Sequence, residues 1–398
     1  MPADAPFTMP TWRPPRPGGA LARIKALAVV RAALAVAPDR IDLKRQAAKL
    51  LYELEQFAEL TDWLRPLANQ TDGDPGLLCW LGQAAERQDP TLSAVALQTA
   101  VAAGCDEAFG PLASTLARLN RPDEALAAAL SALARDPADY RAIVVAARVH
   151  AARTEFREIS ALCRSLWSRG GRNSQILATE AFGHAMSGDE HARDRLVDPD
   201  RWLSIENLPI DPAFNERLMR DLEAGKSLAA LPSTKATIGE ALRYDDIATH
   251  PRESVQELMA LVRVAVERYV RNRVRHADHP MIADRPREID LSSWSLTVRG
   301  DGRETWHIHP SGWVSGVYYV QVPPRDKLTG TAGGIEFGPL PVGPEREGLP
   351  WPRRTILPEA GQLLLFPSYF AHRTFPTGID VPRTVVAFDV LRAAEVDA

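Results

Sequence analysis

The stretch from Trp306 to Tyr319 reads W-H-I-H-P-S-G-W-V-S-G-V-Y-Y and places His307 and His309 two residues apart. Successive side chains of an extended strand point to opposite faces, so residues i and i+2 share a face. If this stretch is extended, both imidazoles point the same way and can converge on one ion. The spacing therefore predicts part of a metal site.

A third histidine and an arginine belong to two later apolar stretches. His372 ends the segment G-Q-L-L-L-F-P-S-Y-F-A-H, and Arg383 opens the segment R-T-V-V-A-F-D-V. A single histidine is usually structural, but a pair at i, i+2 joined by a third at the end of an apolar strand is typical of a metal centre. We expect His307, His309 and His372 to bind one metal ion, with Arg383 placed to hold an anionic cosubstrate.

From residue 291 onward the apolar pattern has a period of two, which is typical of β-strands. Short β-rich runs alternate with turns rich in glycine and proline, a pattern that predicts a sandwich, jelly roll or barrel. The runs are 291–299, 306–309, 313–322, 334–337, 361–366 and 383–390. Residues 325–359 carry six prolines, all from Pro339 onward, and we expect this insert to form a lid or binding loop. The amphipathic segment 251–273 predicts a helix packed across the outside of the barrel.

The first half of the chain contains a helical repeat. Small residues recur in similar apolar frames at spacings of 34, 31, 34 and 34 residues, at Ala48, Gly82, Ala113, Ala147 and Ala181. A period near 34 corresponds to one helix-turn-helix unit, in which a small residue lets the paired helices approach closely. The segment resembles tetratricopeptide repeats, since R-P-D-E-A-L from Arg121 and the later D-P match parts of that motif. A generic alanine-rich α-bundle is the alternative.

Composition narrows the class of partner. The formal net charge of -4 gives no basic excess for a phosphate backbone, so we expect no nucleic-acid partner. No apolar run is long enough to span a bilayer, and the proline-rich start has no signal-peptide core, so we expect a cytoplasmic protein without a membrane partner.

Cys79, Cys105 and Cys163 lie in the helical half and are expected to be reduced, buried thiols. Abundant alanine and arginine are typical of a GC-rich bacterial genome.

The ordered motifs of the second half resemble those of 2-oxoglutarate- and iron(II)-dependent oxygenases of the double-stranded β-helix fold. They are H-I-H-P from His307, S-G-V-Y-Y from Ser315, G-G-I from Gly333, G-Q-L-L-L-F-P, His372 and Arg383. The resemblance covers roughly residues 230–392. It implies that Fe(II) is the metal and that Arg383 grips the distal carboxylate of 2-oxoglutarate, with help from Tyr319. Ser311 and Trp306 are expected to shape the pocket.

The family usually has an aspartate or glutamate where His309 stands, so three compositions of the metal site remain open. His309 can be the third ligand, water can fill the position of the carboxylate, or a carboxylate such as Glu336 can reach in from G-G-I-E. We favour His309. A site with three histidines carries one negative charge fewer than one with two histidines and a carboxylate.

We predict an α+β multidomain protein: an N-terminal α-solenoid of tetratricopeptide-like repeats followed by a C-terminal double-stranded β-helix, or jelly roll. The expected parts are a disordered N-terminus 1–19, the repeats 20–190, a linker with short helices 191–232 and the oxygenase-like domain 233–398. The resemblance implies a dioxygenase that consumes molecular oxygen and 2-oxoglutarate and hydroxylates an acceptor. The repeats are expected to recruit a protein or peptide partner.

Two other functions fit the same residues. A metal cupin uses the same barrel, but the glutamate that its first motif needs is replaced by Trp313 and Val314. The second alternative is a scaffold whose repeats bind a partner and whose barrel has lost catalysis. Iron content and succinate release from 2-oxoglutarate separate these three functions.

Overall fold

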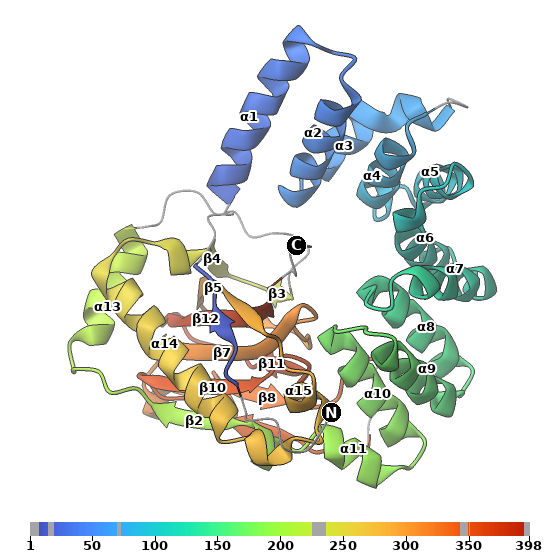
Figure 1. The fold of residues 1–398 in the computed structure, drawn as a ribbon. Helices are drawn as coiled ribbons and strands as arrows, with labels where there is room; N and C mark the ends of the chain where they lie inside the picture. Colours follow the sequence, from blue (N-terminus) through green and yellow to red (C-terminus); the bar gives the residue numbers. More distant parts are fainter. Residues whose placement is uncertain are drawn as a thin grey trace. The chain divides into compact units, whose positions relative to one another are not determined.

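The computed structural model describes residues 8–14, 20–69, 73–224, 236–342, 349 and 351–393. Its internal contacts divide the chain into two units (Figure 1). The helical unit is Gly18–Ser187 with Val342–Glu345. The sheet unit is Met1–Pro17, Gly188–Pro341 and Arg346–Ala398.

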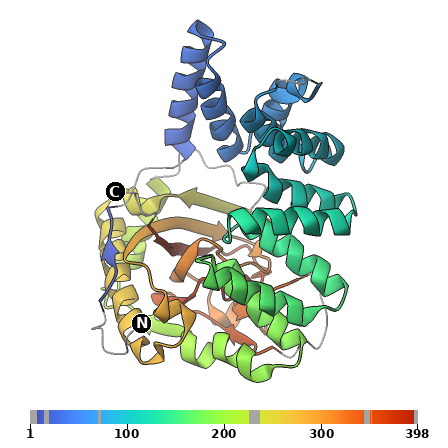
Figure 2. The same cartoon turned by 45° about the vertical axis from the view of Figure 1, so that its right-hand side comes forward.

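The helical unit is a succession of antiparallel helix pairs (Figure 2). Helix α4 packs on α5, α6 on α7, and α8 on α9. The even-numbered helices from α2 to α10 also contact the next even-numbered helix, as expected of stacked hairpins. The bounds are α1 (Ala20–Val36), α2 (Ile41–Glu53), α3 (Phe57–Leu64), α4 (Pro75–Ala85), α5 (Pro90–Ala102), α6 (Phe109–Arg118), α7 (Pro122–Arg135), α8 (Tyr140–Ala152), α9 (Phe156–Ser168) and α10 (Ser174–Met186).

The repeating small residues lie on these even-numbered helices and are buried. Gly82 shows why the position must be small: a Cβ added there would lie 2.4 Å from Leu97 Cγ of the paired helix α5. The predicted helix-turn-helix organisation is therefore present. That these hairpins are tetratricopeptide repeats stays a prediction.

A twisted main sheet forms the centre of the sheet unit. Its strand order is β1-β5-β12-β7-β10-β2, and β4 pairs with β5. The pairs β5–β12, β12–β7 and β7–β10 are antiparallel. The bounds are β1 (Thr11–Trp12), β2 (Ser204–Asn207), β4 (Ala241–Asp245), β5 (Glu288–Val298), β7 (Gly312–Gln321), β10 (Gln362–Pro367) and β12 (Arg383–Arg392).

Two smaller sheets complete a half-barrel. One has the order β11-β8-β9 and the other pairs β3 with β6. An isolated bridge between His307 and His372 joins the loop after β6 to the first of these sheets. The bounds are β3 (Thr237–Ile238), β6 (Arg303–Glu304), β8 (Ile335–Phe337), β9 (Arg354–Ile356) and β11 (His372–Thr374).

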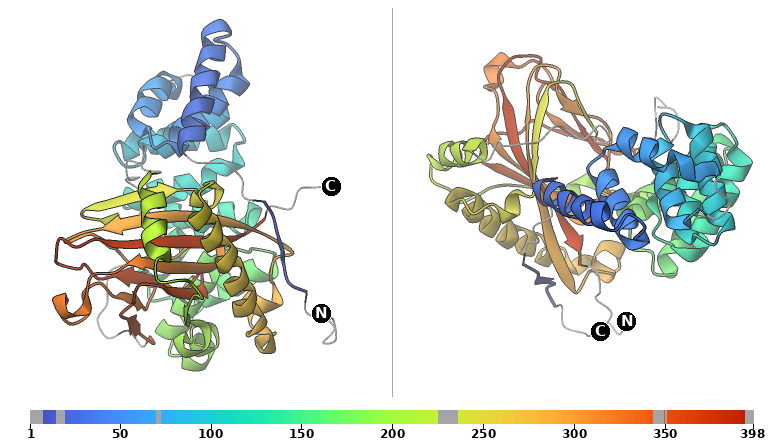
Figure 3. Two further views of the ribbon diagram at one scale, coloured as in Figure 1. Left: turned by 90° about the vertical axis from the view of Figure 1, so that its left-hand side faces the viewer. Right: turned by 90° about the horizontal axis from the view of Figure 1, so that it is seen from above.

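Helices cover one face of the main sheet, with α13 (Phe214–Ala224) and α14 (Glu253–Arg271) lying across its strands (Figure 3, left). Alternation along β7 sends Tyr318 toward this side, where its hydroxyl donates to Asn215 Oδ1 of α13 at 2.6 Å. Tyr319 consequently points to the opposite, inner face. The predicted amphipathic helix 251–273 is confirmed as α14, with the expected apolar positions buried.

Several boundaries differ from the sequence expectations. Thr11–Trp12, in the segment expected to be disordered, pairs with β5, and the Trp12 indole donates to Glu267. Residues 1–7 and 15–19 lie outside the described residues. The expected linker 191–232 does hold short helices, among them α11 (Glu190–Leu196) and α12 (Pro199–Trp202), but its strand β2 is an edge strand of the main sheet. Periodicity misses such pieces because two to four residues are too short to show a period.

Residues 306–309 are not a ladder strand as expected; only His307 forms a bridge. The insert 325–359 contributes β8 and β9. The rest of its expected lid falls partly on residues 343–348 and 350, which lie outside the described residues. Within the described part of the chain, every helix is too short or too polar to cross a membrane.

Candidate metal and cosubstrate site

Backbone hydrogen bonds bring the three histidines together. His307 N–H donates to His372 O, and His372 N–H donates to His307 O, each at 3.0 Å. His309 N–H donates to Ser368 O at 3.0 Å. The two ring centroids of His307 and His372 are consequently 4.2 Å apart, and His309 stacks on His372 at 5.2 Å. Two loops distant in sequence are thus fixed against each other at the site.

The ring nitrogens of these histidines converge. One ligand atom from each of His307, His309 and His372 lies within 4.8 Å of the others, and His309 Nε2 lies 3.4 Å from His372 Nε2. The convergence predicted from the i, i+2 spacing and the distal histidine is therefore present in the folded chain.

Hydrogen bonds on the far side of each ring decide which nitrogen faces the centre. His307 Nδ1 lies 2.7 Å from Thr305 O, and His372 Nδ1 lies 2.9 Å from Phe370 O. Because a carbonyl oxygen only accepts, each of these nitrogens must carry the proton and donate it. The Nε2 atom of each neutral ring then presents a lone pair to the centre. Such second contacts are what orients histidine ligands in metal sites.

The protein environment favours the neutral forms of His307 and His372. Burial lowers the pKa of His372 well below its usual value, and the neighbouring His307 and His309 add to the effect. The pKa of His307 is also lowered, by burial first and then by His309. A cluster of neutral nitrogen acceptors without a donor between them is satisfied by a cation. Imidazole donors suit iron, nickel, copper or zinc.

Asp389 orients His309 and was missed by the sequence interpretation. Its Oδ2 lies 2.9 Å from His309 Nδ1, and its Oδ1 accepts from Ser315 Oγ at 2.6 Å. Ser315 Oγ also lies 2.8 Å from Ser368 Oγ. The signal was present in the sequence, because Asp389 is six residues after Arg383 on one strand and therefore shares its face.

Arg383 is buried, 3% exposed, on the inner face of the main sheet. Its Nη1 donates to Gly333 O at 3.0 Å and its Nη2 to Thr374 Oγ1 at 3.1 Å. Its Nε is buried and has no hydrogen-bond partner among the described residues. Burial lowers the pKa of Arg383, whereas the neighbouring Tyr319 and Glu304 oppose that shift. A buried guanidinium whose contacts are with a carbonyl and a hydroxyl is suited to an anionic ligand.

Tyr319 is also buried beside this guanidinium, and burial raises the pKa of its phenol to about 12. The phenol therefore stays protonated and can donate a hydrogen bond. Thr374 was missed by the sequence interpretation, although it lies two residues after His372 and so shares its face.

Three residues singled out from the sequence point elsewhere. Glu336 lies on the outer face of the small sheet, where it accepts from Arg373 Nε at 2.7 Å and Arg353 Nη1 at 3.3 Å. Its suggested role as a metal ligand is therefore wrong, because strand alternation directs it away from His372. Trp306 lies against Gly338 and under Arg373 instead of lining the inner pocket. Ser311 is exposed in the turn before β7.

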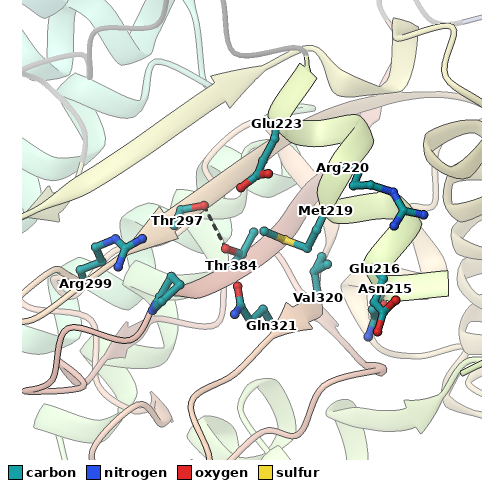
Figure 4. A pocket seen from close by; sticks show the side chains of 11 residues that line it. Asn215, Glu216, Met219, Arg220, Glu223, Thr297, Arg299, Val320, Gln321 and Thr384 are labelled. Atoms are coloured by element: carbon teal, nitrogen blue, oxygen red, sulfur yellow. Dashed lines mark hydrogen bonds between the residues drawn. The ribbon is translucent and has the colours of Figure 1, made fainter. Parts of the chain in front are cut away.

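A hollow of about 590 Å³ lies on the other side of the main sheet, below α13 (Figure 4). It is lined by Thr297, Val320 and Thr384, whose strand neighbours point to the inner face, and by Met219 and Glu223 of α13. Thr297 and Thr384 hydrogen-bond to each other at 3.0 Å across its floor. This hollow is separate from the histidines and Arg383.

The family comparison agrees with this constellation. Residues 292–389 match the model of a family described as "Putative 2OG-Fe(II) oxygenase". The resemblance predicted from the sequence is confirmed. The match spans roughly a quarter of the chain and includes the three histidines, Arg383 and Asp389. The cofactors of that family are Fe(II) and 2-oxoglutarate, and the three histidines can bind the metal. No curated protein matches the chain.

Solved structures resemble about half of the chain. A prolyl-4-hydroxylase from Pseudomonas putida is 13% identical with a TM-score of 0.34, covering 49% of this chain and 94% of that one. HygX from Streptomyces hygroscopicus, with nickel and 2-oxoglutarate bound, is 15% identical with a TM-score of 0.33, covering 52% and 91%. A Trichoplax adhaerens prolyl hydroxylase in complex with a hypoxia inducible factor peptide is 15% identical with a TM-score of 0.34, covering 52% and 92%.

Proposed function

We propose that the protein is a 2-oxoglutarate- and Fe(II)-dependent dioxygenase that hydroxylates an acceptor. One observation carries the proposal. Ring nitrogens of three histidines converge, and the buried Arg383, which hydrogen-bonds to Thr374 two residues after His372, has an Nε without an acceptor among the described residues. The first set fits a cation, and the second fits an anion. A metal ion together with a dicarboxylate satisfies both.

His307, His309 and His372 would hold the metal through Nε2. Three protein ligands leave further positions open to the cosubstrate and to oxygen. When bound, Fe(II) supplies the oxidative chemistry that couples decarboxylation of 2-oxoglutarate to succinate with hydroxylation of a C–H bond. Of the three compositions considered for the site, His309 as third ligand is supported by its contact with Asp389, which fixes its ring.

Arg383 would bind the distal carboxylate of 2-oxoglutarate. Its hydrogen-bond partner Thr374 lies two residues beyond His372 on β11, an advance of about 6.6 Å along an extended strand. That separation suits a five-carbon diacid held by the metal at one end and by Arg383 at the other. The Thr374 hydroxyl accepts from Arg383 Nη2 and from Glu304 N–H, so its own proton is free to donate to the ligand.

Aromatic side chains make the surroundings of the histidines apolar. Phe366 and Phe337 pack against His372 with centroid distances of 4.9 and 5.7 Å, and Trp294 stacks near His309 at 5.7 Å. Such a wall limits water near the reacting groups and strengthens the electrostatic contacts within the site.

Succinate release tests the proposal directly. Purified protein supplied with Fe(II), 2-oxoglutarate and oxygen should form succinate slowly even without an acceptor, and His372→Ala should form none. The neighbouring Arg373→Ala variant should retain the wild-type rate, since Arg373 faces outward. Metal binding without 2-oxoglutarate consumption would favour a cupin, and neither activity would favour a scaffold.

We further propose that the acceptor is a protein or peptide bound by the helical unit. Tyr52 of α2, Ser114 of α6 and Arg141 of α8 form a polar line with Glu86 across successive hairpins. Arg141 Nη1 is buried without a hydrogen-bond partner among the described residues, although Glu86 lies 3.5 Å away. We propose that this polar line contacts the bound peptide. Arg141→Glu should abolish acceptor-dependent turnover and leave acceptor-independent succinate formation unchanged; equal stimulation of both proteins would contradict this role.

A further inference from the structure

Arg243 of β4 lies on the inner face of the main sheet, the face that carries Arg383 and Asp389. Paired residues of neighbouring antiparallel strands share a face, and the register pairs Arg243 with Leu296 of β5 and Leu296 with Val385 of β12. Val385 lies two residues after Arg383 and therefore faces the same side. The inner face thus carries a second buried arginine, 8% exposed, which the sequence interpretation missed.

Aromatic stacking connects this arginine to the candidate metal site. The guanidinium carbon of Arg243 lies 4.3 Å from the centroid of the Trp294 ring. The Trp294 ring in turn stacks near His309, with 5.7 Å between the centroids and 21° between the planes. Cation–π attraction holds a guanidinium over an aromatic face and limits the directions in which its N–H groups can point. The guanidinium is therefore held one aromatic contact away from a candidate metal ligand.

Most of the hydrogen-bonding capacity of Arg243 is unused. Its Nε donates to Asp245 Oδ1 at 2.8 Å, and its Nη1 and Nη2 have no hydrogen-bond partner among the described residues. A guanidinium has five N–H groups, and polar groups in buried side chains nearly always find partners. The two Nη atoms form a fork that matches the two oxygens of a carboxylate. Asp245 positions this fork, because it lies two residues along β4 on the same face.

We propose that Arg243 is a specificity-determining residue that binds a carboxylate of the acceptor peptide. That carboxylate is the side chain of an aspartate or glutamate, or the C-terminal group. The inference rests on the proposed function and names the chemistry that its acceptor must carry. Arg383, bonded to Thr374 of β11, would hold the cosubstrate. Arg243, stacked on Trp294 of β5, would hold the acceptor on the His309 side of the site.

Apolar residues of β5 lie between the two arginines. Leu296 pairs with Arg243, and Val298 pairs with Arg383. Because β4 and β12 flank β5 on opposite sides, two strand spacings, roughly 10 Å, separate the backbones that carry the two guanidinium groups. The cosubstrate carboxylate bound at Arg383 is therefore not expected to need Arg243.

Binding of peptide pools to protein saturated with Ni(II) and 2-oxoglutarate tests the inference. Three pools of short random peptides are compared: amidated peptides with aspartate and glutamate, amidated peptides without them, and free-acid peptides without them. Wild type should retain one of the two carboxylate-bearing pools about 10- to 100-fold more strongly than the neutral pool, as expected of hydrogen bonds between charged groups. Mass spectrometry of the retained peptides shows whether a side-chain or a terminal carboxylate is bound.

Arg243→Gln should retain all three pools alike. Its acceptor-independent succinate formation and its 2-oxoglutarate affinity should stay at wild-type values, which a purely structural role would not predict. Arg243→Lys keeps the charge but not the fork and should retain only part of the preference. If glutamine also impairs succinate formation, the lysine variant decides: a full wild-type preference in it would overturn the role of the fork.

Arg299→Gln is the matched control. Arg299 also pairs with an aspartate, Asp380, but it lines the hollow on the other side of the main sheet. This variant should keep the wild-type preference. Equal retention of the three pools by wild type, or an unchanged preference in Arg243→Gln, would overturn this inference alone. Absence of succinate formation by wild type would overturn the proposed function on which it rests.

Discussion

Both faces of the small sheet β11-β8-β9 carry polar side chains. Those on the outer face pair with each other, whereas the inward-facing nitrogen of His372 has no donor beside it. On β11 and β8, His372 pairs with Phe337 and Arg373 pairs with Glu336. On the outer face, Glu336 is bound by Arg373 and by Arg353, so charge is balanced within the protein. On the inner face, His372 Nε2 faces His309 Nε2. Arg383 of the main sheet donates to Thr374 of β11, and its buried Nε lacks a partner within the described part of the chain.

This contrast separates residues that stabilise the fold from residues that bind ligands. Buried polar groups are nearly always satisfied, so groups left unsatisfied on one face indicate what the protein binds there. Here the missing partners are a cation near the histidines and an anion near Arg383. Arg373 provides a matched control for His372, because the two residues are neighbours on β11 and their side chains face opposite ways.

The largest effect is expected from His372→Ala. Removing this ring deletes a metal ligand while the backbone hydrogen bonds to His307 can remain, so Ni(II) affinity should fall by about 100-fold or more. Isothermal titration checks this loss. Arg373→Ala changes the next residue on the outer face and should bind Ni(II) as wild type does. Equal affinities in the two variants would remove His372 from the metal site.

The next largest effect concerns Arg383. Arg383→Ala should weaken binding of 2-oxoglutarate to Ni(II)-loaded protein by about 30- to 100-fold, as expected when an anion loses its charge-assisted hydrogen bonds. Arg383→Lys keeps the charge but not the planar fork and should recover only part of the affinity. Ni(II) binding itself should not change. A wild-type 2-oxoglutarate affinity in Arg383→Ala would place the cosubstrate elsewhere.

A smaller effect is expected from Asp389→Asn. The substitution keeps the shape of the side chain but removes the charge that orients His309, so Ni(II) affinity should fall by about tenfold. Asp380→Asn is the control, because Asp380 is exposed and pairs only with Arg299 in the described contacts. No difference between the two variants would show that Asp389 does not position His309.

A separate effect, on folding and not on ligand binding, is a pH dependence of stability that arises from His279. Burial lowers the pKa of this ring to about 4 from the ordinary 6.5, and Met281 N–H donates to its Nδ1 at 3.1 Å. Because the pKa is lower in the folded state, the stabilisation is complete above pH 6.5 and is lost as the pH falls toward about 4. The free energy of unfolding should fall by up to about 3 kcal/mol over this pH range.

Urea unfolding of metal-free protein at several pH values measures this term. His279→Gln should be less pH-dependent than wild type between pH 6.5 and 4, and identical slopes would contradict the assignment. Unlike the candidate ligands, His279 has partners at both nitrogens, since Tyr369 Oη lies 3.1 Å from its Nε2. It therefore represents a histidine whose role is structural.

Periodicity and spacing predicted the elements that are long or strongly patterned. The amphipathic pattern located α14, and the runs 313–322 and 383–390 correspond closely to β7 and β12. The i, i+2 pair with a distal histidine predicted the convergence that the folded chain shows. Helical periodicity and strand alternation are properties of a short segment of backbone. They are therefore present in the folded chain whichever distant segments pair with it.

What could not be predicted depends on long-range pairing. Strand β1 contains two residues that pair with β5 far along the chain, and β2 joins the main sheet from a segment rich in helix and proline signals. The direction of Glu336 depends on which face of a three-residue strand is inward, and its own sequence does not specify this. The outward position of Trp306, in contrast, follows from its place next to His307.

The central claim is that metal and 2-oxoglutarate bind the same inner face cooperatively. Isothermal titration of 2-oxoglutarate into wild-type protein, once metal-free and once saturated with Ni(II), tests it most directly. The claim predicts one molecule bound per chain with strong affinity only when the metal is present. Equal affinity with and without Ni(II), or no binding to the Ni(II)-loaded protein, would contradict it.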